Sequence, residues 1–122
     1  MNWLQQAIWW GAILTGCSQT IVFNVPPAET LRILVYSKGR PVQECGIAPG
    51  SPQQQKLSAW LSRNTDAWSA TPVTYVPGVK VSGENFSVNF VGTRVILNYS
   101  EGQCSHPANP SEYEFLLCDG RS

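Results

Sequence analysis

The chain has 122 residues, of which 43% are hydrophobic and 13% are charged, and its eight basic residues balance its eight acidic residues. This length and composition suit one globular domain and exclude a disordered chain. Because the charges are scattered and cancel, no concentrated positive field is present, so we expect neither nucleic-acid binding nor electrostatic binding to anionic lipid headgroups.

The N-terminal residues 3–16 form an uncharged and mainly apolar stretch that ends at Cys17. It is too short to span a bilayer, which takes about 20 apolar residues, but it has the length of the apolar region of a signal peptide. Leu14-Thr15-Gly16-Cys17 resembles the lipobox of bacterial lipoproteins. The resemblance implies a signal peptide over residues 1–16, acylation of Cys17 and a mature domain over residues 17–122. The Ser18 that follows implies anchoring at the periplasmic face of the outer membrane.

The next segments predict strands and a hairpin. Thr20–Val25 is rich in β-branched residues and is stopped by Pro26-Pro27. Thr30–Tyr36 alternates in the manner of a strand, Ser37-Lys38-Gly39-Arg40 predicts a turn, and Val42–Cys45 predicts a short return strand.

A single convincing helix is predicted from Ser51 onward. Ser51 can cap it, Pro52 suits the first helical position and Gln54 completes a capping box. We expect the helix to end near Asn64. The apolar residues at helical spacing, which predict one buried face, are Leu57, Trp60, Leu61 and Trp68.

The remainder predicts a β meander with polar turns. The expected strands are Val73–Val76, Val79–Ser82, Phe86–Phe90, Arg94–Tyr99 and Tyr113–Cys118. Apolar and polar residues alternate along them, as in an antiparallel sheet with one face in water. The predicted fold class is therefore α+β, an antiparallel meander of about five or six strands with one helix packed on one face.

The cysteines have a predicted pairing. With Cys17 acylated, we expect a disulfide between Cys104 and Cys118, which closes a loop of about 15 residues and is worth about 3 kcal/mol in the chain-entropy model. A bond from Cys45 to Cys118 remains open. A zinc site built from these three cysteines and His106 lacks the paired ligand spacing of structural zinc sites, so we expect no metal and no cofactor.

Two functional classes remain. The leading one is a non-enzymatic, membrane-tethered protein that binds another protein, either as an inhibitor or immunity protein or as an accessory subunit of an envelope assembly. We expect the binding residues Ser105, His106 and Asn109 to lie on a loop between Cys104 and Pro110, because the apolar helix and sheet faces are needed for the core. The alternative is a small envelope hydrolase that uses His106 with Glu112 and Glu114.

Overall fold

The computed structural model describes residues 20–71 and 74–118. The signal peptide predicted over residues 1–16, the acylation site at Cys17 and the start of the strand predicted at Val73 lie outside the described residues. Within the described ranges, no helix combines the length and apolarity needed to cross a bilayer.

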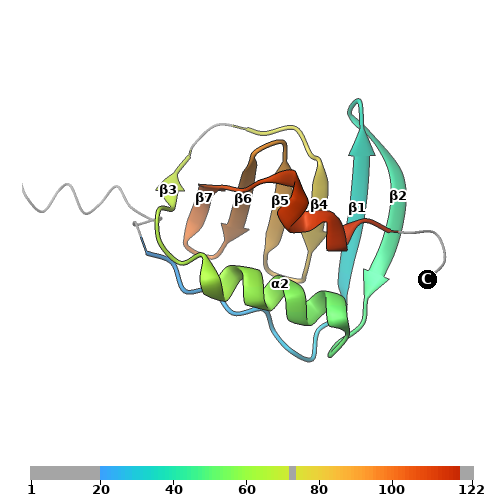
Figure 1. The fold of residues 1–122 in the computed structure, drawn as a ribbon, viewed down its shortest axis with the longest axis horizontal. Coiled ribbons are helices and arrows are strands. Elements are labelled where there is room, and N and C mark those ends of the chain that lie inside the picture. The colour runs from blue at the N-terminus through green and yellow to red at the C-terminus, as the bar shows by residue number, and fades with distance from the viewer. Residues whose placement is uncertain (1–19, 72–73, 119–122) are drawn as a thin grey trace, which may run out of the picture.

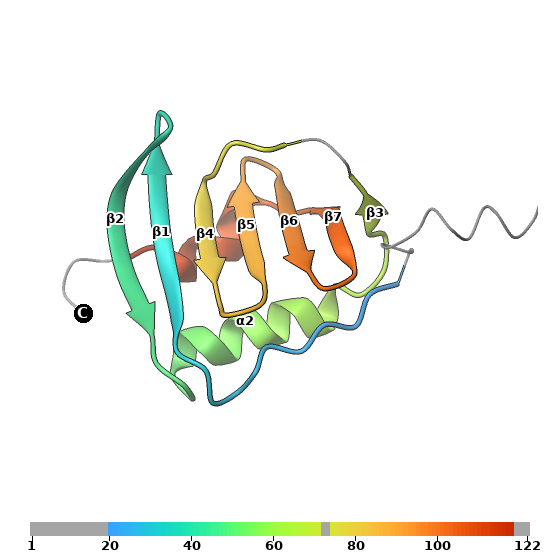
Figure 2. The ribbon, with the colours of Figure 1, turned by 180° about the vertical axis from the view of Figure 1, so that it is seen from behind.

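One antiparallel sheet organises the fold, with α2 (Pro52–Arg63) and the 3₁₀ helix η2 (Pro110–Leu116) on the same face (Figures 1 and 2). Its spatial order is β2-β1-β4-β5-β6-β7-β3. The strands are β1 Leu31–Ser37, β2 Arg40–Ile47, β3 Ser69–Ala70, β4 Val79–Ser82, β5 Ser87–Val91, β6 Arg94–Tyr99 and β7 Gly102–Pro107. This arrangement confirms the predicted α+β class. The sheet has seven strands instead of the expected five or six, and β3 and β7 are strands that the sequence did not predict.

Helix α2 begins and ends as its sequence predicts. The Ser51 side chain accepts a hydrogen bond from the Gln54 amide, Pro52 opens the first turn, and Asn64 is the C-cap. The capping box differs in one detail, since the side-chain oxygen Oε1 of Gln54 accepts from the backbone amide of Gly50, one residue before the cap, at 2.6 Å. Satisfying these amides at the helix start is the physical basis of the N-terminal signal.

The hydrophobic core lies between α2 and the sheet. Leu57, Trp60 and Leu61 of α2 are buried, as the helical spacing predicts. On the sheet, one row of register partners crosses β1, β4, β5, β6 and β7 without any solvent exposure: Ile33, Val81, Val88, Leu97 and Cys104. We call this side the inner face of the sheet and the opposite side the outer face.

The strand predicted at Thr20–Val25 is wrong, because this segment is irregular. Its backbone bonds elsewhere: the Ile21 amide donates to the Thr65 carbonyl at 2.7 Å. The Phe23 ring packs against Phe86 and Tyr99, with centroid distances of 4.9 and 5.5 Å. The segment therefore packs across one end of the sheet, and Figure 2 shows it running beside α2 below the strands.

Two further strand predictions are wrong. Tyr113–Cys118 lies mostly in η2, which Pro110 opens and which packs on the inner face through Leu116 and the stacked Phe90 and Tyr113 rings. Residues 74–76 form no strand and belong to the connection from β3 to β4. The last strand of the sheet is instead β7, in the segment that the sequence indicated as a loop.

Candidate binding surface

The predicted binding loop is a strand, and two of its three residues are buried. Ser105 is 3% exposed and His106 is 9% exposed, both within β7. Ser105 accepts a hydrogen bond from Arg94, and the His106 ring lies 5.6 and 4.9 Å from the rings of Trp60 and Trp68. The prediction that Ser105 and His106 lie on an exposed loop is therefore wrong. Asn109, at the position before η2, is exposed.

The residues of the hydrolase alternative do not form a hydrogen-bonded catalytic arrangement. Glu112 accepts a hydrogen bond from Trp60 Nε1 at 3.0 Å, and the His106 ring nitrogen Nδ1 lies 2.6 Å from the Pro107 carbonyl oxygen. Across residues 20–71 and 74–118, no hydrogen bond joins His106 to Glu112 or to Glu114. Both carboxylates are exposed on η2, not on the predicted strand.

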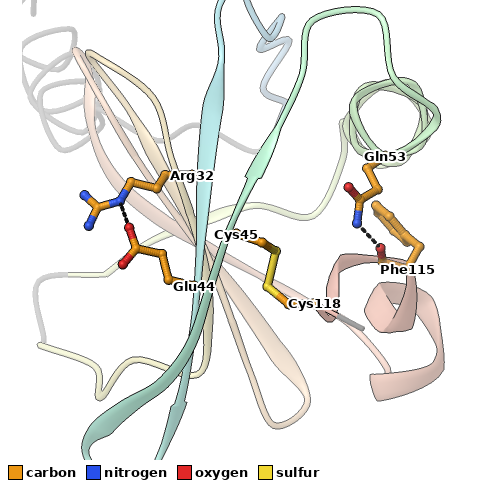
Figure 3. Close-up of a disulfide and its surroundings, with 6 residues drawn as sticks. All are labelled: Arg32, Glu44, Cys45, Gln53, Phe115 and Cys118. Atoms are coloured by element: carbon orange, nitrogen blue, oxygen red, sulfur yellow. Dashed lines mark hydrogen bonds and ion pairs between the residues drawn. A yellow bond between two sulfur atoms is a disulfide. The ribbon is translucent and has the colours of Figure 1, made fainter. Parts of the chain in front are cut away.

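The structure corrects the disulfide pairing. Cys118 bonds to Cys45, with a Cα–Cα distance of 6.0 Å (Figure 3), so the predicted Cys104–Cys118 pair is wrong and the alternative that the sequence left open is confirmed. Cys45 is the register partner of the inner-face residue Ile33, and η2 brings Cys118 to the same side. Cys104 is buried in the inner face. A zinc site using Cys45 and Cys118 is inconsistent with this bonding, and the described residues contain no cluster of three metal-ligating side chains.

The hairpin of β1 and β2 forms a different exposed surface. β2 lies at an edge of the sheet, and β4 pairs with β1 only over Arg32–Val35. The hairpin continues beyond this pairing to Ser37 and Arg40, so its turn projects past the ends of β4 and β5 (Figure 1). Residues 37–44 are all exposed, and we call them the exposed hairpin segment.

The turn at the tip is held by its backbone. Lys38 and Gly39 have positive φ values of 53° and 80°, the combination that a tight two-residue hairpin turn requires. The register slips between Val35 and Tyr36, which leaves Val42 without a partner on β1 and 57% exposed. Sequence analysis identified this turn, but only the structure shows that it extends beyond the neighbouring strand.

The exposed hairpin segment carries basic and apolar side chains, and its acidic residue, Glu44, is paired with Arg32. Lys38 and Arg40 stand in a stretch, residues 33–43, that contains no acidic residue. Pro41 offers no amide hydrogen, so the edge is poorly suited to pairing with a further strand. The groups that this surface offers to a partner are therefore side chains, among them those of Lys38, Arg40 and Val42.

The base of the hairpin is fixed on both faces of the sheet. The Cys45–Cys118 disulfide ties β2 to the end of η2 on the inner side. On the outer side, Arg32 Nε donates to Glu44 Oε2 at 2.6 Å (Figure 3). The hydrogen bond to Glu44 and its negative charge raise the pKa of Arg32 above its ordinary value. Because this pair is exposed, it orients the two side chains more than it stabilises the fold.

Comparison with protein-family models, curated proteins and solved structures finds no match to this chain. The exposed hairpin segment is thus defined by its own exposure, charge and register.

Proposed function

We propose that this protein is an exported, non-enzymatic protein that acts by binding an acidic surface of another protein through its exposed hairpin segment. The observation that carries the proposal is a hairpin that projects beyond the sheet and presents Lys38 and Arg40 on a basic, fully exposed stretch. The Cys45–Cys118 disulfide supports export, because such bonds persist in oxidising compartments. The lipobox-like sequence at Cys17 supports a lipid anchor at the periplasmic face of the outer membrane.

The geometry suits binding at low entropic cost. A tight turn and a fixed base leave little backbone freedom to lose on association, so the cost is mainly that of ordering side chains, about 0.5–1.5 kcal/mol each. Arginine is enriched among the residues that contribute most binding energy at interfaces. Opposite charge on the partner would speed the encounter and fix its orientation.

Inhibition is the mode that a projecting tip favours. A narrow basic hairpin can enter a cleft lined by carboxylates, as found in hydrolases that use paired acidic residues. We therefore propose an inhibitor or immunity protein, and a role as an accessory subunit of an envelope assembly is an outcome that the experiment below distinguishes.

Charge reversal tests the proposal. Lys38→Glu/Arg40→Glu should reduce capture of the partner from an envelope extract at least about tenfold, equivalent to about 1.4 kcal/mol, and should leave the unfolding midpoint nearly unchanged. The matched control is Lys56→Glu/Arg63→Glu, which makes the same charge change on the exposed side of α2. Equal capture by both variants would refute binding through the hairpin.

The identity of the captured protein separates the two modes. An inhibitor should hold one hydrolase or toxin, and the activity of that enzyme should fall as the wild-type domain is added but not as the Lys38→Glu/Arg40→Glu variant is added. Capture of a multi-protein envelope complex with no loss of any enzymatic activity would show an assembly role instead.

A further inference from the structure

The outer face of the sheet carries two adjoining hollows that the hairpin does not use. The first has a volume of about 220 Å³ and the second, which is wider and more open, about 490 Å³. Lys80, Ser87 and Asn98 line both, so the two form one continuous depression across β4, β5 and β6. We call it the outer-face hollow.

The first hollow is roofed by Thr74, Tyr75 and Pro77, from the described part of the connection between β3 and β4. Asn89 holds this connection with both ends of its amide: Oδ1 accepts from the Gly78 amide at 2.8 Å, and Nδ2 donates to the Val76 carbonyl at 3.1 Å. At its other end, Gln103 Nε2 donates to the Thr71 carbonyl at 2.9 Å. Gly78 passes so close to β5 that a Cβ there would collide with the Phe90 carbonyl oxygen. Val76 and Gly78 are therefore held against β5, and Thr71 is held by Gln103 of β7.

The floor of the hollow is polar and is placed by the strand register. Lys80 of β4 is the register partner of Asn89 on β5, which is the partner of Ile96 on β6. Ser87 and Asn98 are partners in the adjacent row. Since these side chains project from paired strands and not from loops, their positions are fixed before any ligand arrives, which lowers the cost of binding.

Lys80 brings a positive charge into the outer-face hollow. In the described parts of the chain it makes no ion pair, and Arg32–Glu44 is the ion pair found there. Glu44 lies two strands away in the same row and is bonded to Arg32, and the exposed Glu84 lines the second hollow without an ion pair to Lys80. A positive charge among hydroxyl and amide groups, half-buried and without a partner, favours an anionic ligand group.

Aromatic side chains stand at both ends of the depression. Tyr75 lines the first hollow, where its hydroxyl oxygen lies 3.0 Å from Thr71 Oγ1. Tyr99 and Phe86 line the second. The Phe86 ring is buried against Phe23, so the rings that can cover an apolar ligand face are those of Tyr75 and Tyr99. They stand beside hydroxyl and amide groups that can bind ligand hydroxyls.

From this combination we infer that the outer-face hollow binds an acidic saccharide, with its carboxylate at Lys80 and its hydroxyl groups at Ser87 and Asn98. The proposal is independent of the hairpin, because Lys38, Arg40 and Val42 line neither hollow. It assigns the protein a second site, for a small ligand, on the same face of the sheet as the Arg32–Glu44 pair.

The test is a titration of the ¹⁵N-labelled domain followed by NMR. Glucuronate and N-acetylmuramate are the acidic probes, glucose and N-acetylglucosamine are their neutral counterparts, and inorganic phosphate is the anion without a sugar. At least one acidic probe should shift the side-chain amide signals of Asn98 in a saturable way. Its affinity should exceed that of its neutral counterpart and of phosphate by about tenfold or more.

Two variants locate the site. Lys80→Met keeps most of the side-chain length without the charge and should weaken binding of the acidic probe about tenfold, whereas Lys56→Met on α2 should leave it unchanged. Ser87→Ala, a second change in the floor, should also weaken it. Absence of saturable shifts with both acids, equal binding of a neutral sugar or of phosphate, or wild-type affinity in Lys80→Met would each overturn the inference.

Discussion

His106 and Asn109 stand three residues apart in opposite environments. His106 packs against Trp60 and Trp68 in the core, whereas Asn109 is exposed and its side chain makes no capping hydrogen bond to η2. Replacing His106 with alanine opens a cavity beside both indoles, so we expect a loss of about 2–4 kcal/mol in the free energy of unfolding. Asn109→Ala should change it by less than about 0.5 kcal/mol. Urea unfolding measures both, and equal midpoints would contradict the burial of His106.

The Cys45–Cys118 bond joins residues 73 positions apart, and a loop of that length gives it a large effect on the unfolded chain. The chain-entropy model predicts that Cys45→Ser/Cys118→Ser lowers the free energy of unfolding by about 4 kcal/mol. The double substitution is preferable to reduction because it removes the Cys45–Cys118 bond alone. Urea unfolding and peptide mapping under non-reducing conditions check the stability and the pairing. A Cys104–Cys118 peptide would contradict the structure.

Two tyrosines predict alkaline sensitivity. Burial raises the pKa of Tyr99 and of Tyr113 above the ordinary value of 10.0, and for Tyr99 the nearby Glu101 charge adds to the effect of burial. The unfolded chain therefore releases these protons first. Their contribution to stability is complete below pH 10.0 and is lost as the pH rises through the raised pKa values. The urea midpoint should fall over this range, and less steeply in Tyr99→Phe and Tyr113→Phe. A fall of equal steepness in wild type and in both variants would exclude the tyrosines as its source.

At the scale of elements, Gln54 connects α2 to the irregular segment before β1. It is buried, and its Nε2 lies within 3.4 Å of the carbonyl oxygens of Pro26, Pro27 and Glu29. Gln54→Leu leaves these carbonyls and the Gly50 amide without this partner, so we expect a loss of about 1–3 kcal/mol in the free energy of unfolding. Gln55→Leu, on the exposed side of the same turn, is the control and should have little effect. Hydrogen exchange should show faster opening near the segment in the Gln54 variant alone.

The elements that were predicted correctly carry strong local signals. Ser51, Pro52 and Asn64 mark the ends of α2, and the alternation in Arg94–Tyr99 predicts β6 with its observed bounds. β7 was missed because Cys, Ser, His and Pro are weak strand formers, and its place in the sheet depends on pairing with β6. Tyr113–Cys118 has a strand-like composition, but its contacts with α2, including Gln53 to the Phe115 carbonyl, favour η2 (Figure 3).

At the scale of the whole molecule, the sequence predicts the two-layer architecture because apolar residues alternate on the strands and recur at helical spacing on α2. It does not predict either candidate site, since both depend on how far neighbouring elements extend. The exposed hairpin segment exists because β1 is longer than its pairing with β4, and the outer-face hollow exists because the β3–β4 connection crosses strands that it does not join. Such relations between distant segments leave no local pattern.

Acylation of Cys17, which the lipobox resemblance implies, would decide where the domain acts. Two or more acyl chains at the mature N-terminus would hold it stably at a membrane. Cys45 and Cys118 bond to each other, so neither of these thiols is free to be acylated. A sulfur in a thioether cannot also form a disulfide, so acylation of Cys17 and a disulfide through Cys17 exclude each other.

We expect the full chain, expressed in a bacterial host that processes lipoproteins, to incorporate a labelled fatty acid and to sediment with membranes. Cys17→Ser should lose both properties, because it removes the only sulfur to which the lipobox resemblance assigns the lipid. Cys45→Ser/Cys118→Ser is the matched control, since it removes two thiols and keeps the Leu14–Cys17 sequence, and it should retain the label. An unlabelled wild-type protein that yields a Cys17–Cys104 peptide on digestion would rule out the anchor. Binding through Lys38 and Arg40 would then still be decided by the charge-reversal experiment, because the hairpin does not depend on how the N-terminus is held.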